Sequence, residues 1–342
     1  MKNLLGLILA FALVLGGCAS ASSSQTSPAP SAPPSSPAVS EPVEPLPVAA
    51  LKGPTAMGMV KLMADDEAQG RYSFTIAGAA DEITPKLVQG DIQIAAVPAN
   101  LAAVLYNNTK GGVQVLAINT LGVLYIVENG DDIHTVEDLR GKTILSAGKG
   151  ATPEYALNFM LRQNGLDPEK DVTIDFKSEH SECAAILNTK DKAIAMLPQP
   201  FVTAAQMKNE EIRVALDLNR EWALSQEQPS SLVTGVVVAR TDFVRQNPQA
   251  VADFLAAYKA SVDYVTDPQN IEPASDLIAK YDIVSAAIAQ RAIPQCNIAF
   301  IAGEEMRARL SGYLSILHDQ NPKAVGGIIP GEDFYFVGQP AL

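Results

Sequence analysis

Small and polar residues stand at several points where a short apolar run gives way to a helical pattern. The first N–H groups of a helix have no partner within that helix, so such junctions can bind a polar or anionic group. Each helix dipole adds ~0.3 to 1 kcal/mol to the hydrogen bonds themselves. The candidate ligand-binding residues at these junctions are Thr55, Ala56, Met57, Ala99, Asn100, Asn119, Thr120, Gly150, Ala151, Thr152, Gln199 and Phe201.

Several of these residues also have an ordinary structural interpretation. Thr55, Thr152 and Asn100 can simply cap helices, and Phe201 can pack in a core instead of stacking on a ligand. No arginine stands at any of these junctions. A strongly anionic sulfonate is usually bound by a guanidinium group. The sequence therefore leaves both an anionic ligand and a neutral or heteroaromatic ligand open.

The groups needed for catalysis or metal binding are missing from the same junctions. They contain no cysteine and no histidine, and the chain has no Gly-x-Ser-x-Gly motif. We therefore expect no catalytic residues, no metal and no cofactor, although a Ser-His-Asp arrangement assembled by the fold stays open. His134, His180 and His318 stand in polar surroundings and are expected at the surface. Cys183 and Cys296 are expected to be buried apolar residues.

The first residues of the chain have the pattern of an export signal. Lys2 precedes an apolar stretch over residues 4–15, which is too short to span a bilayer comfortably. The stretch ends in Leu15-Gly16-Gly17-Cys18, which resembles the bacterial lipobox. This resemblance implies that residues 1–18 are a lipoprotein signal and that Cys18 is lipidated, anchoring the protein to the bacterial cell membrane.

Residues 19–47 consist almost entirely of Ser, Pro, Ala and Thr, and cannot build a core. We expect a disordered tether there. The rest of the chain is long enough for two lobes. The net charge of -13 predicts an acidic surface and argues against a nucleic-acid partner, which would need clustered Lys and Arg.

Short apolar runs alternate with amphipathic stretches after the tether, which is typical of an α/β fold. A self-contained unit over residues 129–231 interrupts the pattern, and the chain beyond residue 241 is almost wholly helical. We expect lobe one over residues 48–128 and 232–342 and lobe two over residues 129–231. The two connections near residues 126–131 and 228–233 would form a hinge.

Several segments, in this order, resemble the bacterial solute-binding proteins of the nitrate, sulfonate, taurine and thiamine-pyrimidine group. The resemblance implies a type II periplasmic-binding-protein-like fold with two α/β lobes and a ligand in the cleft between them. It also implies an extracytoplasmic component of an ABC importer, which delivers a small organic solute or anion to a permease and ATPase complex. The segments are Gly53-Pro54-Thr55-Ala56-Met57, Leu87-Val88-Gln89-Gly90-Asp91-Ile92, Asp138-Leu139-Arg140-Gly141-Lys142, Gly148-Lys149-Gly150-Ala151-Thr152 and Asn247-Pro248-Gln249-Ala250-Val251.

One turn departs from that group. Sulfonate and taurine members generally place a Trp or an Asp where this chain has Pro198-Gln199-Pro200-Phe201, so the substrate is left unnamed. Two other functions stay open. A ligand-sensing lipoprotein acting on a membrane receptor would use the same closure of the lobes. A thiamine-pyrimidine-synthase-like enzyme would resemble the same group, but its cysteine-rich motif does not occur here.

Overall fold

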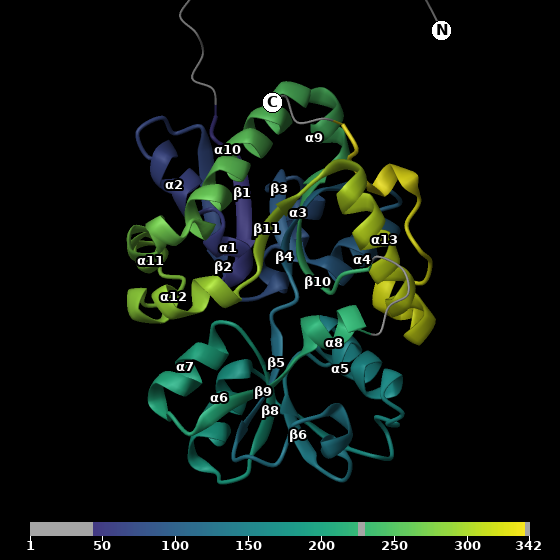
Figure 1. Cartoon of the computed structure of the whole chain (residues 1–342). Helices are drawn as coiled ribbons and strands as arrows, with labels where there is room; N and C mark the ends of the chain where they lie inside the picture. Colours follow the sequence, from purple (N-terminus) through teal and green to yellow (C-terminus); the bar gives the residue numbers. More distant parts are fainter. Residues whose placement is uncertain (1–43, 225–229, 339–342) are drawn as a thin grey trace, which may run out of the picture. The chain divides into compact units, whose positions relative to one another are not determined.

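The computed structural model describes residues 44–224 and 230–338, which build two β-sheets flanked by helices (Figure 1). In the first sheet the strand order is β11-β4-β10-β3-β1-β2. β1 pairs in parallel with β2 and β3, whereas β10 runs antiparallel to both β3 and β4. The strands are β1 (Leu46–Leu51), β2 (Tyr72–Ala77), β3 (Ile94–Pro98), β4 (Val113–Leu121), β10 (Val233–Arg240) and β11 (Ile298–Ile301).

The second sheet repeats this plan in the order β7-β6-β8-β5-β9. β6 pairs in parallel with β7 and β8, and β5 runs antiparallel to β8 and β9. Its strands are β5 (Leu124–Asn129), β6 (Thr143–Ser146), β7 (Thr173–Phe176), β8 (Ile194–Pro198) and β9 (Ile212–Asp217). In each sheet the strand that enters from the other sheet, β10 in the first and β5 in the second, runs antiparallel to both of its neighbours. The two lobes are built alike in this respect.

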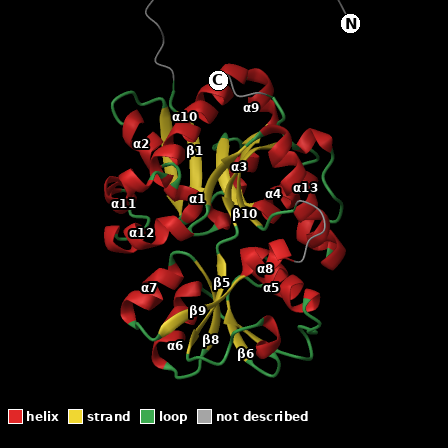
Figure 2. Ribbon diagram, in the orientation of Figure 1, coloured by secondary structure: helices red, strands yellow, loops and turns green. Residues whose placement is uncertain are grey.

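Helices cover both sheets (Figure 2). The α-helices are α1 (Pro54–Met57), α2 (Val60–Asp66), α3 (Thr84–Gln89), α4 (Ala99–Asn108), α5 (Thr152–Gln163), α6 (His180–Thr189), α7 (Phe201–Lys208), α8 (Leu218–Leu224), α9 (Thr241–Gln246), α10 (Pro248–Thr266), α11 (Ile271–Lys280), α12 (Ala286–Ala292) and α13 (Gly303–Gln320). Short 3₁₀ helices are η1 (Ala80–Glu82), η2 (Val136–Leu139), η3 (Pro268–Asn270), η4 (Ile293–Gln295), η5 (Pro322–Val325) and η6 (Glu332–Phe334). The expected α/β class is confirmed.

The first sheet is buried on both faces. Successive side chains of a strand point to opposite faces, so Ala95 and Val97 of β3 contribute to one apolar cluster and Ile94 and Ala96 to another. The first cluster includes residues of α4 and α13, and the second includes residues of α1, α2, α10 and α11. Because both faces of the sheet are buried, a strand such as β3 is apolar along its whole length.

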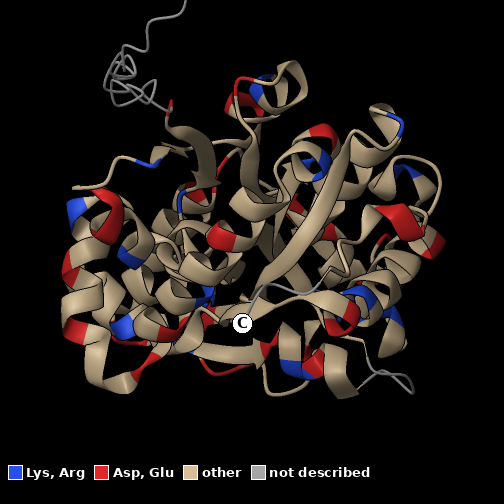
Figure 3. Ribbon diagram, turned by 90° about the horizontal axis from the view of Figure 1, so that it is seen from above, with Lys and Arg blue, Asp and Glu red and all other residues tan. Residues whose placement is uncertain are grey.

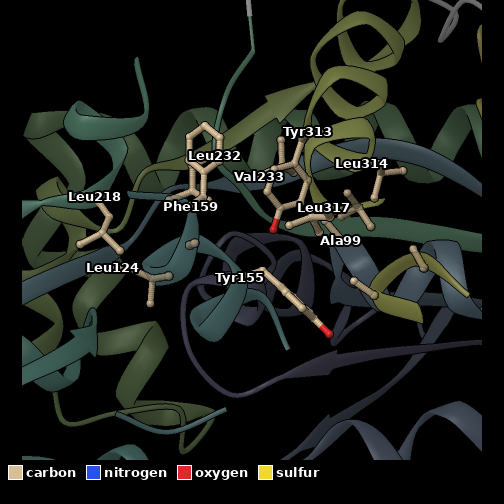
Figure 4. Packing of buried hydrophobic residues seen from close by; sticks show 14 of the residues in the cluster. Ala99, Leu124, Tyr155, Phe159, Leu218, Leu232, Val233, Tyr313, Leu314 and Leu317 are labelled. Carbon is tan, nitrogen blue, oxygen red and sulfur yellow. The ribbon is translucent and has the colours of Figure 1, made fainter. Parts of the chain in front are cut away.

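The first apolar cluster also extends into lobe two, where it joins α5 and α8 to α13. Phe159 of α5 lies 4.3 Å from the ring of Trp222 on α8, and Trp222 lies 5.5 Å from Tyr313 on α13, all distances between ring centroids. Figure 4 shows Phe159 beside Leu232 and Tyr313 beside Val233, at the start of β10. The two lobes therefore share buried apolar surface.

The first of the two connections between the sheets lies elsewhere than expected. The chain passes from β4 to β5 at Gly122 and Val123, before the expected segment over residues 126–131, so residues 124–128 belong to the second sheet and not to lobe one. The physical reason is local: a β-carbon at Gly122 would lie 2.7 Å from Asn219 Cβ, so the crossing requires a glycine. The return lies between α8 and β10, and Ser230 to Leu232 are its described residues.

Smaller differences concern individual elements. β1 begins at Leu46, inside the segment expected as tether, because its N–H donates to the carbonyl oxygen of Arg71 over 2.8 Å and continues the pairing with β2. The helical segment after β1 is divided at Gly58 and Met59 into α1 and α2. β11 interrupts the region beyond residue 241 that was expected to be almost wholly helical. Residues 1–43, including Cys18, lie outside the described residues.

Charged residues of both signs are interspersed over the outer helices (Figure 3). Many form exposed pairs such as Lys52 with Asp282 and Lys280 with Glu67, which contribute little to stability individually. In the two described stretches, no helix combines the length and the apolar character needed to cross a bilayer.

Candidate functional site

A cavity of about 230 Å³ lies between the two sheets, and residues of both lobes form its wall. We refer to it as the interlobe cavity. Most of the wall is apolar, and threonine hydroxyls, one amide, one imidazole and one lysine complete it. The lining residues are Leu51, Lys52, Gly53, Pro54, Thr55, Pro98, Thr120, Val123, Leu124, Ala151, Thr152, Pro153, His180, Pro198, Gln199, Pro200, Phe201 and Thr234.

Five helices begin at the wall of this cavity. The starts of α1 and α4 come from lobe one, and the starts of α5, α6 and α7 come from lobe two. Within the described part of the chain, no N-cap side chain of these helices accepts a hydrogen bond from its own helix. Apart from the N–H of Thr203 in α7, which donates to Gln199 Oε1, the first N–H groups are thus left for other acceptors, and the dipoles add favourable potential for an electron-rich group.

Six of the twelve candidate residues line the cavity: Thr55, Thr120, Ala151, Thr152, Gln199 and Phe201. Strand–helix junctions from both lobes are therefore brought together, as the junction argument predicts. The other six, Ala56, Met57, Ala99, Asn100, Asn119 and Gly150, are not among the lining residues.

The candidates outside the wall have structural positions. Ala56, Met57 and Ala99 are fully buried in the apolar clusters, because their side chains point from the helix towards the core. Asn119 lies within β4 and not in a break of the strand; its amide nitrogen donates to the carbonyl oxygen of Thr55 over 3.4 Å. Gly150 is exposed, and its N–H donates to Glu154 Oε2.

Thr152 connects the cavity wall with the interior of lobe one. Its Oγ1 donates to Asn100 Oδ1 over 3.1 Å and accepts a hydrogen bond from the hydroxyl of Tyr313 over 3.3 Å. All three side chains are buried. Asn100 therefore acts behind the wall, where it fixes the position of Thr152.

Gln199 has a similar supporting role on the other side of the cavity. Its Oε1 accepts hydrogen bonds from the backbone N–H and the hydroxyl of Thr203, at 3.3 and 2.8 Å, which fixes the start of α7. Its Nε2 donates to Gln295 Oε1 of lobe one over 2.8 Å. The hydroxyl of Tyr125 also reaches the carbonyl oxygen of Gln295, at 3.0 Å. Gln199 thus links the lobes and orients the turn that carries Phe201.

His180 does not lie at the surface as expected; it lines the cavity at the first turn of α6. Its ring centroid lies 5.5 Å from that of Phe201, and burial lowers the pKa of the imidazole to about 4. The imidazole is therefore neutral at pH 7. The signal was available in the sequence, because His180 follows the strand at residues 172–176 in the same way that Thr152 follows the strand at residues 143–146.

Thr234 is a second lining residue that the sequence analysis did not single out. It lies on β10, whose neighbour Gly235 packs against Asn119 and Thr55. Threonine is a common residue in strands, so its type alone does not distinguish it. Only the fold places it at the cavity.

In the described ranges, no group of three or more His, Cys, Asp or Glu residues is arranged to hold a metal ion. Cys183 and Cys296 are buried and free, as expected from their spacing. Burial raises the pKa of the Cys183 thiol to about 11 and that of Cys296 to about 12.

Comparison with known proteins decides the family. Residues 67–281 match the family model described as "ABC transporter, phosphonate, periplasmic substrate-binding protein". The chain belongs to this family. No curated protein matches the sequence of this binding protein.

Solved structures show the same fold at low sequence identity. An ABC transporter protein from Parabacteroides distasonis has a TM-score of 0.73 and 19% identity, over 87% of this chain and 100% of that one. The periplasmic aliphatic sulphonate binding protein of Escherichia coli has a TM-score of 0.69 and 18% identity, over 87% and 93% of the chains. The periplasmic nitrate-binding protein of Synechocystis has a TM-score of 0.53 and 14% identity, over 72% and 69%.

These findings confirm the fold and the resemblance stated from the sequence. The binding protein has the two-lobed, periplasmic-binding-protein-like architecture, and sulphonate- and nitrate-binding proteins are among the similar structures. The phosphonate family itself was not among the groups that the sequence analysis named. At these identities the similar structures show the fold alone.

Proposed function

We propose that this binding protein captures a small organic solute or anion in the interlobe cavity and delivers it to the permease and ATPase complex of an ABC importer. One observation carries the proposal: both lobes contribute helix starts to the same cavity. A solute that touches both lobes binds the closed arrangement better than an open one, so it shifts the population towards closure. The permease would then recognise the closed protein.

The two chain connections between the sheets support this mechanism. Lobe two is joined to lobe one only through the β4–β5 crossing and the return before β10, as far as the described residues show. Rotation at two short connections changes the distance between the lobes without disturbing either sheet. We place lobe one around the first sheet and lobe two around the second, with the first boundary at Gly122.

We further propose that the protein is held outside the cytoplasm by a lipid on Cys18. The order of Lys2, an apolar stretch and Leu15-Gly16-Gly17-Cys18 supports this anchor. Several acyl chains, at ~0.8 kcal/mol per buried methylene, would hold the protein stably at the membrane. Cys18→Ser should abolish lipid labelling and membrane retention; retention of a processed serine variant would contradict the anchor.

Binding, and not turnover, is the proposed activity, because the family consists of transport binding proteins. Conversion of a bound solute by the purified protein would contradict this. A sensing role would use the same cavity and the same closure. Uptake by liposomes that contain the permease and ATPase distinguishes the two, since import requires no separate receptor.

The cavity can be tested with one filling variant and a matched control. A thermal-shift screen should cover sulfonates, phosphonates, nitrate and neutral heteroaromatic compounds. A ligand at 1,000 times its dissociation constant adds about 4 kcal/mol to the free energy of unfolding. Ala151→Trp, in the wall, should abolish the shift, whereas Ala185→Trp, exposed on α6, should retain it. Equal shifts in both variants would place the solute elsewhere.

A further inference from the structure

The interlobe cavity offers no free positive side chain to an anion. Among its described lining residues, only Lys52 and His180 can carry a positive charge. Lys52 Nζ forms an ion pair with Asp282 over 2.8 Å, and burial keeps the imidazole of His180 neutral by lowering its pKa. An anion in this cavity would be bound by backbone N–H groups and helix dipoles alone.

The apolar wall makes such binding costly. Leu51, Val123, Leu124 and Phe201 form part of the wall, together with five prolines. Moving a charge out of water into such surroundings is costly even after the protein relaxes, and much more so than moving an uncharged group. The dipoles of the helix starts offset only part of this cost, and their potential also favours the electron-rich atom of an uncharged molecule. The balance of these terms favours a solute without net charge.

Two polar side chains of the wall lack hydrogen-bond partners. Within the part of the chain that the structure describes, His180 Nδ1 and Thr234 Oγ1 are buried and make no hydrogen bond. They come from opposite lobes: His180 from α6 in lobe two and Thr234 from β10 in lobe one. A buried polar atom without a hydrogen-bond partner destabilises the protein. A solute that supplies both partners recovers this cost and joins the lobes.

We propose that the interlobe cavity selects an uncharged solute with a flat apolar body, held at one edge by Thr234 and at the other by His180. The ring of Phe201, 5.5 Å from the imidazole, supplies a flat apolar surface next to the second edge. Both side chains line the cavity, so a solute there lies next to each of them. The hydroxyl and the neutral imidazole can each donate or accept, so amides, lactams and nitrogen heterocycles fit. This inference rests on the proposed solute capture and specifies its chemical class.

Matched pairs of small molecules test the charge preference. Isothermal titration should compare benzamide with benzoate, nicotinamide with nicotinate, and benzenesulfonamide with benzenesulfonate and phenylphosphonate. The uncharged member should bind at least tenfold more tightly in each set. Tighter binding of the anionic members would overturn the inference and leave solute capture standing. Silence from every compound, including the thermal-shift panel, would contradict solute capture and the inference with it.

Two variants test the named residues. Thr234→Val removes the hydroxyl at nearly constant shape, and His180→Phe keeps a flat ring but removes both nitrogens. Each should weaken binding of the uncharged compound about tenfold, while the free protein stays as stable as the wild type or becomes more stable, since an unpaired buried atom is removed. Thr189→Val, exposed on the same helix as His180, should change neither property. Wild-type affinity in both site variants would overturn the assignment, and so would an equal loss in Thr189→Val.

Discussion

Thr152 Oγ1 donates a hydrogen bond to Asn100 Oδ1 over 3.1 Å and so connects the start of α5 in lobe two with the start of α4 in lobe one. The hydroxyl of Tyr313 donates to the same oxygen over 3.3 Å. This buried chain lies directly behind the wall of the interlobe cavity, where Thr152 is also a lining residue. The contact between the lobes and the solute site therefore share one side chain.

Thr152→Val should reduce the free energy of unfolding by about 1 to 3 kcal/mol, because the amide of Asn100 and the hydroxyl of Tyr313 lose a buried partner. Urea unfolding measures the loss. A double-mutant cycle with Tyr313→Phe should give a coupling energy above about 0.5 kcal/mol. Strict additivity would mean that the two hydroxyls do not interact.

The only tryptophan in the sequence, Trp222, should report solute binding. Its ring contacts Phe159 in lobe two at 4.3 Å and Tyr313 in lobe one at 5.5 Å, so a change in the position of the lobes alters its surroundings. Saturating solute should shift or quench the emission of Trp222. Trp222→Phe should bind the solute without this signal. Unchanged emission on confirmed binding would argue against relative movement of the lobes.

The stability of the protein should depend on the protonation of His180. The pKa of His180 is about 4 in the folded protein, below its ordinary value of 6.5 in the unfolded chain, because the imidazole is buried. The unfolded chain therefore binds more protons than the folded protein between these values, so stability falls as pH decreases from about 6.5 to 4. The loss of stability over this range is of the order of 3 kcal/mol.

His180→Phe removes the titrating imidazole and leaves the carboxylates in place. The difference in the free energy of unfolding between the two proteins therefore isolates the effect of His180. The variant should gain stability relative to the wild type as pH decreases through this range. Parallel pH profiles in urea unfolding would show that the imidazole is not buried as described.

Gly235 should tolerate no side chain. A β-carbon there would lie 2.5 Å from Asn119 Oδ1 and 2.7 Å from Thr55 Cγ2, so Gly235→Ala forces the wall of the cavity to move. We expect a loss of about 1 to 3 kcal/mol in stability and weaker solute binding. In Gly130→Ala the nearest contact would be an ordinary 3.7 Å, so that variant should resemble the wild type. Equal behaviour of the two variants would contradict the packing at Gly235.

The sequence pattern predicted those elements for which the period of the apolar residues and the positions of the turn residues indicate the same boundaries. β2, β6 and β9 follow the alternation of apolar runs and amphipathic stretches expected of an α/β fold, because each is a short run between clear breaks. β11 was missed because four residues between helices carry too little periodic signal. The apolar run over residues 113–127 indicated strands correctly, but a continuous run does not reveal where the chain leaves one sheet for the other.

The candidate site was predictable in part for a similar reason. Helix starts after strands are visible in sequence, which is why Thr55, Ala151 and Thr152 were predicted, and these three residues line the interlobe cavity. Which residue of a helix start points into the cavity depends on the orientation of the helix, so Ala56 and Met57 proved to be core residues. Thr234 is distant in sequence from every other lining residue, and only the fold brings it to the cavity.

Hydrogen exchange measured by mass spectrometry, with and without a solute found in the thermal-shift screen, tests the central claim most directly. If the solute bridges the lobes in the interlobe cavity, protection should increase in residues 51–55 and 120–124 and also in residues 151–155 and 198–203. Those segments surround the cavity from both lobes. Protection confined to one lobe, or centred on the distant surface around residues 165–171, would contradict the account.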